Sequence, residues 1–206
     1  MPLEIDHFAI ACETLSQGVE YVQDTLGVAL LVQGQHPKMG THNRLLSLGP
    51  NIYLEVISVD PNAPRPPHPR WFDLDSFSGN PRVTNWICRT NDLKAAIANS
   101  SENVGQPMAF ERGKYRWDMA VPADGKLPYD GCFPALIQWH GNAHPASELA
   151  DVNCRFLCAT IQHPNTTELT SSLEPLQPPK GIRFVQGDIP AFAISIETPT
   201  GERTLK

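Results

Sequence analysis

The strongest constraint on the fold of this chain is the order of the segments in its first sixty residues, which the sequence pattern predicts to be a strand, a helix and three further strands. Residues 3–12 alternate between two faces, as the residues of a β-strand do. After the helix come three short runs rich in β-forming residues and separated by Gly, Pro and Asn, at residues 28–33, 43–48 and 52–59. The pattern therefore predicts a first βαβββ module over residues 1–60.

The helix of this module carries signals at both of its ends. Thr14 and Gln17 have the spacing of a capping box, in which a hydroxyl and an amide satisfy the first free backbone groups of a helix. Gly27 provides a left-handed stop at the other end. Between these signals, one apolar stripe is formed by Leu15, Val19, Val22 and Leu26. The sequence thus predicts a helix with one buried face.

The same plan returns later in the chain. A strand-like run at residues 82–90 precedes a helix that Asn91 or Asp92 can cap. Three further strand-like runs follow, at residues 108–112, 115–121 and 132–140. We therefore predict a second βαβββ module over residues 82–147.

The segment between the two modules, residues 61–81, is rich in proline, which forbids a regular strand or a long helix there. It also holds Trp71, Phe72 and Phe77, and a segment this aromatic does not favour disorder. We interpret it as a packed linker with one short helical turn, rather than as a proline-rich recognition segment.

The last part of the chain, residues 148–206, starts the plan a third time. It reads as one strand, one helix and two strands, so we predict a partial third module that lacks one strand. A chain of 206 residues is long enough to bury a sizeable core, and we expect the three units to form a single domain.

The composition narrows the classes of partner. The net charge is −6 at pH 7, whereas a protein that binds nucleic acid usually carries a basic patch. No apolar run approaches the length of about 18 residues that a membrane span needs, and the start does not resemble a signal peptide. The five cysteines have no disulfide-framework or CxxC spacing. We therefore expect a cytoplasmic protein that binds neither nucleic acid nor a membrane.

Two polar residues interrupt otherwise apolar strands of the first module, His7 in its first strand and Glu55 in its last. When the two modules are aligned on their helices, Asn85 falls opposite His7, and when they are aligned on their last strands, Gln138 falls opposite Glu55. A lone histidine in a strand is commonly a hydrogen-bonded structural residue, and a half-buried glutamate is commonly an ion-pair partner. The residues alone leave both a functional site and a structural role open.

The repeated βαβββ plan resembles the vicinal-oxygen-chelate superfamily, which includes glyoxalases, bleomycin-resistance proteins and extradiol dioxygenases. Four stretches are similar to recurrent elements of one branch, the glyoxalase-like domain family: RWFDLD, NWICRTNDL, YRWDMAVP and FPALIQWHGNAHP. The resemblance covers most of residues 1–145. It implies an α+β fold in which paired βαβββ modules form a curved mixed sheet around a cleft, with the partial third module at the C-terminal end.

The resemblance also implies a site. The first and last strands of each module supply metal ligands in this superfamily, so the matching residues His7, Glu55 and Gln138 are expected to hold a divalent metal such as Zn, Ni, Mn or Fe. A substrate with adjacent oxygen atoms would then chelate the metal. Glu55 has a second interpretation as a general base whose pKa is raised by its apolar neighbours. Contacts to substrate are expected from His140, Arg116 and Asn85.

Other residues have competing interpretations. Arg112 and Arg116 can each recognise a carboxylate or a phosphate through bidentate hydrogen bonds, or lie at the surface. We interpret Trp117 and Trp139 as core residues rather than as a platform for substrate. The histidines expected in or beside solvated loops are His36, His42 and His68.

Two classes of function follow from the resemblance. The first is an enzyme that acts on a small oxygenated metabolite in the cleft, as a metal-dependent lyase, isomerase or dioxygenase. The second is a metal-free protein that binds or sequesters a small molecule. Asn85 and Gln138 depart from a full set of ligands, which weighs against a glyoxalase I reaction and against iron-dependent ring cleavage. The resemblance further implies a homodimer, because members of the superfamily commonly dimerise.

Overall fold

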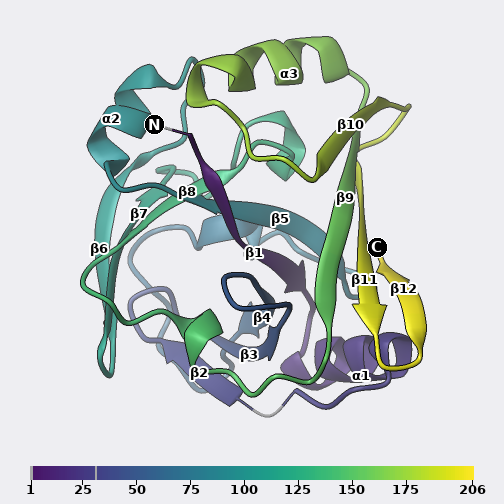
Figure 1. Cartoon of the computed structure of the whole chain (residues 1–206). Helices are drawn as coiled ribbons and strands as arrows, with labels where there is room; N and C mark the ends of the chain where they lie inside the picture. The colour runs from purple at the N-terminus through teal and green to yellow at the C-terminus, as the bar shows by residue number, and fades with distance from the viewer. Residues whose placement is uncertain (1, 31) are drawn as a thin grey trace.

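The computed structural model describes residues 2–30 and 32–206 and confirms the predicted α+β fold. Eight strands form one curved mixed sheet in the order β2-β3-β4-β1-β5-β8-β7-β6 (Figure 1). The first module consists of β1 (Glu4–Ala11), α1 (Leu15–Leu26), β2 (Val32–His36), β3 (Thr41–Ser47) and β4 (Tyr53–Val59). The second consists of β5 (Arg82–Arg89), α2 (Leu93–Asn99), β6 (Gln106–Arg112), β7 (Tyr115–Val121) and β8 (Ala135–Trp139).

The two modules lie side by side and are joined at the centre of this sheet. There β1 and β5 are antiparallel, while the last strand of each module runs parallel to the first strand of the same module. The sheet curls so far that its two edge strands approach each other. Lys38 Nζ, which follows β2, donates a hydrogen bond of 2.9 Å to the carbonyl oxygen of Ala109 in β6. Residues from opposite edges of the sheet can therefore meet in its interior.

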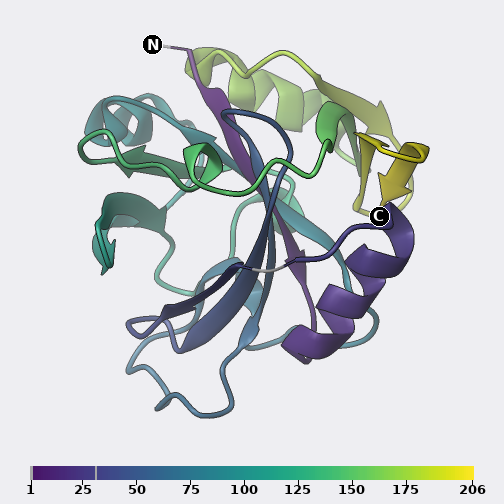
Figure 2. The same ribbon diagram turned by 60° about the horizontal axis from the view of Figure 1, so that its bottom comes forward.

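The C-terminal unit forms a separate sheet of four strands in the order β10-β9-β11-β12 (Figure 2). Its elements are β9 (Arg155–His163), α3 (Thr166–Leu173), β10 (Ile182–Gln186), β11 (Ala191–Thr198) and β12 (Gly201–Leu205). The unit does not lack a strand, because β12 follows β11 after a turn at Thr198 to Gly201, beyond the last predicted run. The order of its strands nevertheless differs from that of the two modules.

The large sheet has a core on each face. Its outer face packs against the helices and against the C-terminal unit, and the buried residues there include Phe8, Ile10, Leu54, Trp86, Ile161, Leu169 and Ile194. Its inner face packs against the 3-10 turn η1 (Trp71–Asp73) of the linker, with Ala9, Ile57, Ile87, Trp117 and Ile137 among the buried residues. The linker is thus a packed segment, as its aromatic residues predict. No helix in the described part of the chain is long and apolar enough to cross a membrane.

The predicted capping box of α1 is present, since Thr14 accepts from the backbone of Gln17 and the Gln17 side chain accepts from the backbone of Thr14. Gly27 ends the helix with φ of 71°. Within the helix, Gly18 faces the sheet closely. A Cβ atom at this position would lie 2.5 Å from both Cys12 Sγ and Val56 Cγ1. The helix can approach the sheet this closely only because residue 18 has no side chain.

We expect Gly18→Ala to destabilise the protein, although alanine favours a helix over glycine by about 1 kcal/mol. Relief of the overlap with Cys12 and Val56 forces the helix away from the sheet, and overpacking of this kind costs about 1–3 kcal/mol. Urea unfolding would measure the change in the free energy of unfolding. Gln23→Ala, at an exposed position of the same helix, is the matched control. A gain in stability from Gly18→Ala would contradict the packing described.

Candidate functional site

The structure brings His7 and Glu55 together on the inner face of the sheet. They lie on the neighbouring parallel strands β1 and β4 and are only 4% and 5% exposed. His7 Nε2 is 3.6 Å from Glu55 Oε2. The Tyr53 ring stacks on the His7 ring with a centroid distance of 4.4 Å and so fixes its plane. Two residues that are far apart in sequence therefore face the same buried space.

Behind His7 lies Asp6, whose side chain is fully buried. Its Oδ1 is 2.7 Å from His7 Nδ1, and its Oδ2 is 2.9 Å from both Trp139 Nε1 and His144 Nε2. Consecutive residues of a regular strand point to opposite faces. Here the register between β1 and β5 shifts between Ile5 and His7, and such an irregularity can re-aim a side chain. The Asp6 carboxylate can thereby bind His7 Nδ1, while His7 Nε2 is directed toward Glu55.

This arrangement fixes the charges of the three groups. Burial alone would lower the pKa of His7, but its hydrogen bonds to Asp6 and Glu55 raise that pKa to about 9. Burial alone would raise the pKa of Glu55, but His7, His36 and Asn43 together lower it to about 2. Hydrogen bonds from His144 and His7 likewise hold the pKa of Asp6 well below its ordinary value against the effect of burial. The expectation of a raised pKa for Glu55 is therefore wrong, because hydrogen bonds to the ionised form outweigh its apolar surroundings.

On the other side of Glu55 lie Asn43 and His36. Asn43 Nδ2 donates a hydrogen bond of 2.5 Å to Glu55 Oε1, and His36 Nε2 is 3.9 Å from the same oxygen. Burial, and then the nearby charge of Arg112, lower the pKa of His36 to about 4, against the opposing effect of Glu55. His36 is therefore neutral at pH 7. Its Nδ1 is 3.1 Å from Thr41 Oγ1, so this nitrogen can carry the proton and leave Nε2 as an acceptor.

Arg112 reaches this group from β6, at the opposite edge of the sheet. Its Nη1 lies 3.4 Å from His36 Nε2 and 3.5 Å from Asn43 Oδ1. A Cβ atom at Gly34 would overlap Arg112 Nη1 and lie 2.5 Å from Asn43 Oδ1, so this glycine makes room for the guanidinium. Within the described part of the chain, Arg112 forms no ion pair with a carboxylate.

We call the space bounded by His7, His36, Asn43, Glu55 and Arg112 the polar hollow. Its remaining walls are mainly aromatic and include Tyr53, Trp71, Phe72, Trp117 and Trp139. The free volume is about 20 Å³, which is room for about one water molecule. Trp117 is thus both a core residue and a wall of the hollow, while Trp139 is a partly buried wall residue that packs against the same core. Any ligand larger than water has to displace side chains to enter.

Four of the predicted site residues do not reach the hollow, namely Gln138, His140, Arg116 and Asn85. Gln138 Oε1 accepts a hydrogen bond of 2.8 Å from the backbone N–H of Leu93, at the start of α2. His140 is half-exposed and lies 3.0 Å from Asp118. Arg116 is exposed, with Glu111 3.8 Å away. In β8 it is Ile137 and Trp139 that line the hollow, so the alignment of Gln138 with Glu55 does not place Gln138 in the site.

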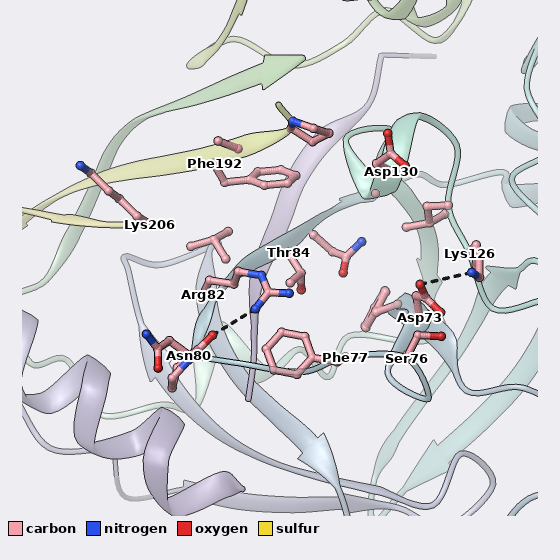
Figure 3. Close-up of a pocket in the computed structure, with 18 of the residues that line it drawn as sticks. Asp73, Ser76, Phe77, Asn80, Arg82, Thr84, Lys126, Asp130, Phe192 and Lys206 are labelled. Carbon is pink, nitrogen blue, oxygen red and sulfur yellow. Dashed lines mark hydrogen bonds and ion pairs between the residues drawn. The ribbon is translucent and has the colours of Figure 1, made fainter. Parts of the chain in front are cut away.

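Asn85 lies elsewhere on the inner side of the sheet. It is 2% exposed and borders a second, larger cavity of about 950 Å³ at the junction with the C-terminal unit (Figure 3). We call this space the junction cavity. The first strands of the two modules pair antiparallel, with His7 opposite Ile87 and Ala9 opposite Asn85. His7 and Asn85 therefore hold equivalent positions in their modules, as the alignment on the helices predicts. Equivalent positions in the two modules thus face two different cavities.

Several residues of the hollow were not predicted from the sequence. His36 was expected in a loop, but β2 begins later than predicted and ends at this histidine. Nothing in the sequence marks Asn43 as a site residue, apart from its place in the alternating pattern of β3. Arg112 was one of two equivalent candidates. The adjacent pair Asp6 and His7 did offer a signal, because a carboxylate beside a histidine commonly orients the imidazole.

The residues of the hollow do not complete a metal site. In residues 2–30 and 32–206, no group of three or more His, Cys, Asp or Glu side chains is placed to hold a metal ion. Two donors, Arg112 Nη1 and Asn43 Nδ2, both lie 3.4 Å from His36 Nε2 and occupy its lone pair. His7 and Glu55 remain, whereas catalytic zinc sites use about three protein ligands.

Comparison with known proteins identifies the family. A sequence model described as a glyoxalase-like domain matches residues 5–177. Among solved structures, a hypothetical protein from Staphylococcus aureus has a TM-score of 0.63 at 14% identity, with 93% of this chain and 88% of that chain covered. Methylmalonyl-CoA epimerase from Mycobacterium tuberculosis has a TM-score of 0.44 at 18% identity, with coverages of 68% and 88%. No curated protein sequence matches the chain.

The Staphylococcus aureus structure shows that the fold extends over nearly the whole chain, including most of the C-terminal unit. The family match covers both modules, the linker and the beginning of the C-terminal unit. The resemblance in the sequence motifs, the paired modules and the family match agree. The chain belongs to the glyoxalase-like domain family.

Proposed function

We propose that this protein binds a small oxygenated metabolite in the polar hollow and does so without a metal ion. The observation that supports this most directly is Arg112. Its guanidinium makes two long hydrogen bonds, of 3.4 and 3.5 Å, and has no carboxylate partner in the described part of the chain. A guanidinium held in a partly buried position without a counterion can gain charge-assisted hydrogen bonds from the oxygen atoms of a ligand.

The surrounding groups define the chemistry of the ligand. Glu55 is ionised and can only accept hydrogen bonds, so it suits a hydroxyl group. Arg112 and the protonated His7 can only donate, so they suit a carbonyl or carboxylate oxygen. The aromatic walls suit the carbon skeleton. These preferences together favour a hydroxy acid or a hydroxy ketone with its two oxygen groups on adjacent carbons.

Proton-transfer catalysis is less well supported than binding. A general acid or base is most effective when its pKa lies near the working pH. Glu55 has a pKa of about 2 and His7 a pKa of about 9, so neither gives up or takes up a proton readily at pH 7. The charges of the hollow are fixed, and fixed charges suit recognition.

A second candidate is a metal-dependent enzyme of the lyase, isomerase or dioxygenase type. The observation that favours it is the pairing of Asp6 with His7 Nδ1, which leaves His7 Nε2 directed toward Glu55. A carboxylate behind a histidine is typical of metal ligands. A Zn, Ni, Mn or Fe ion held by His7 and Glu55 would polarise a substrate oxygen. Binding would require His7 to lose its proton and a third ligand to be released, such as His36.

Metal analysis separates the two candidates. For protein purified without a histidine tag, we expect substoichiometric metal by mass spectrometry and an unchanged melting temperature in excess chelator, because His36 is already occupied by Arg112 and Asn43. Stoichiometric metal in the wild type that is absent from Glu55→Ala would favour the enzyme instead. Reloading both proteins with Zn, Ni, Mn and Fe before analysis controls for loss of metal during purification.

Ligand binding tests the proposal itself. Glycolate carries a hydroxyl and a carboxylate on adjacent carbons, and its binding can be followed by NMR titration. We expect Arg112→Gln to weaken binding by about tenfold or more, since a hydrogen bond to a charged group contributes about 1.5–3 kcal/mol. Arg116→Gln is the matched control, because Arg116 is exposed on the neighbouring strand. Equal affinities for the wild type and Arg112→Gln would contradict the proposal.

A further inference from the structure

We propose that the junction cavity is a second ligand site, which takes a small organic anion with a flat apolar body and a hydrogen-bond donor. It lies between the linker, the start of β5, the 3-10 turn η2 (Tyr129–Gly131) and β11. Among the residues that the structure describes, Phe72 alone lines both this cavity and the polar hollow. The inference goes beyond the proposed function, since it concerns a separate cavity and a separate ligand.

The first observation is an unpaired acceptor at the cavity wall. Asn85 is 2% exposed, and its Oδ1 is buried without a hydrogen-bond partner in the described part of the chain. The buried hydroxyl of the neighbouring Thr84 is also without a partner there. A buried polar atom left unpaired costs about 1–3 kcal/mol. Both residues line the cavity, so an N–H or O–H group of a ligand can satisfy them.

The second observation is a cation without a counterion. Arg82 stacks on the Phe77 ring, with its guanidinium carbon 4.3 Å from the ring centroid. Its Nη1 donates to the carbonyl oxygens of Ser78 and Asn80, at 2.9 and 3.2 Å, but Arg82 has no ion pair in the described part of the chain. Lys126, also at the wall, is 3.5 Å from Asp73. Arg82 is therefore held in place with its positive charge available to an anion.

The third observation is the apolar surface that lies between these polar groups. Phe72 and Phe192 are buried and Phe77 is partly buried, and all three line the cavity. Figure 3 shows Phe192 and Phe77 on opposite sides of the space, with Thr84 and Arg82 between them. Aromatic side chains of this kind favour a flat apolar ligand. The anionic group at Arg82 and the donor at Asn85 would then set its orientation.

The backbone around the cavity is also unusual. Phe72 and Asp73 have φ of 59° and 52°, and Tyr129 and Asp130 have φ of 54° and 53°. Residues other than glycine rarely adopt the left-handed region, at a cost of about 1–2 kcal/mol each. These two pairs account for four of the six such residues in the described part of the chain, and Phe72, Asp73 and Asp130 line this cavity. Strain of this kind concentrates at ligand sites.

The position of the cavity predicts an effect on stability. Arg82 and Asn85 belong to the second module, whereas Phe192 belongs to the C-terminal unit. A ligand that contacts both units only in the folded protein shifts the equilibrium away from the unfolded state. Binding should therefore raise the melting temperature and also protect the amides of β11 from hydrogen exchange.

Indole-3-acetate is a suitable probe, because it combines a flat ring, an N–H donor and a carboxylate. Isothermal titration calorimetry on the full chain should show one molecule bound per chain. We expect Arg82→Met and Asn85→Ala each to weaken binding by at least about tenfold, as the loss of a charge-assisted or buried hydrogen bond predicts. Lys94→Met, at an exposed position of α2, is the matched control. Tryptophol, which lacks the carboxylate, should bind more weakly to the wild type.

Thr84→Val keeps the shape of the side chain and provides a second test if Asn85→Ala does not fold. No binding of indole-3-acetate at millimolar concentration would overturn the proposal, and so would equal affinity in the wild type and Arg82→Met. Titration of Arg82→Met with glycolate distinguishes a failure of this proposal from a failure of the function proposed for the polar hollow. Unchanged glycolate binding in that variant would show that the two sites are independent.

Discussion

Replacement of Asp6 by alanine is expected to lower the free energy of unfolding by about 3–5 kcal/mol, the range for removal of one partner from a buried charged pair. The Asp6 carboxylate is fully buried and accepts from His7, Trp139 and His144. Its loss leaves a protonated His7 facing only Glu55 and leaves the indole N–H without an acceptor. Urea unfolding monitored by tryptophan fluorescence would measure the change.

Two variants sharpen this prediction. Asp6→Asn keeps an acceptor oxygen but removes the charge, so its loss of stability should lie between those of the wild type and Asp6→Ala. Asp118→Ala is the matched control, because Asp118 pairs with the half-exposed His140 and an exposed pair contributes about 0–1 kcal/mol. A small effect of Asp6→Ala, similar to that of the control, would show that Asp6 does not organise the site.

The stability of the protein is expected to fall by about 3 kcal/mol between pH 6.5 and pH 9, because each unit of pKa difference is worth about 1.4 kcal/mol. The pKa of His7 is raised from 6.5 to about 9 by Asp6 and Glu55, whose hydrogen bonds outweigh the effect of burial. Over this range the folded state holds a proton that the unfolded state has released. The contribution of His7 is therefore complete below pH 6.5 and is lost as the pH rises toward 9.

The free energy of unfolding measured at several pH values would test this. His7→Gln should remove most of the decline, since glutamine does not titrate. His140→Gln changes a half-exposed histidine that follows β8 and should leave the decline intact. A decline of the same size in His7→Gln would mean that another group is responsible.

At acid pH, the Asp6 and Glu55 carboxylates should lose their contributions to the free energy of unfolding as the pH falls below their unfolded pKa values of 3.8 and 4.5.

The order of the elements in the two modules could be predicted because its signals are local. The capping box at Thr14, the stop at Gly27 and the period-two pattern of β1 act over a few residues each. The meeting of His7 and Glu55 could also be anticipated. The resemblance to a family with known strand neighbours places these two residues on adjacent strands, and the structure confirms that β1 and β4 pair.

The sequence of β8 did not predict which of its residues face the hollow. Alternation divides its residues into two sets, but Leu136 of one set and Ile137 of the other are both buried, so the pattern does not say which set faces the hollow. The structure turns Ile137 and Trp139 inward and leaves Gln138 to cap α2. Gln138 lies between these two residues in the strand and therefore faces away from the hollow.

The sequence by itself determined the repeated modules, their helices and the pair His7 and Glu55, because these depend on contacts between near neighbours or on adjacent strands. Only the tertiary structure decided that Arg112 meets His36, since these residues belong to the two edge strands and approach each other through the curl of the whole sheet. Curvature is the sum of many small twists along eight strands. No single segment encodes it, so neither the polar hollow nor the junction cavity can be derived from the sequence pattern.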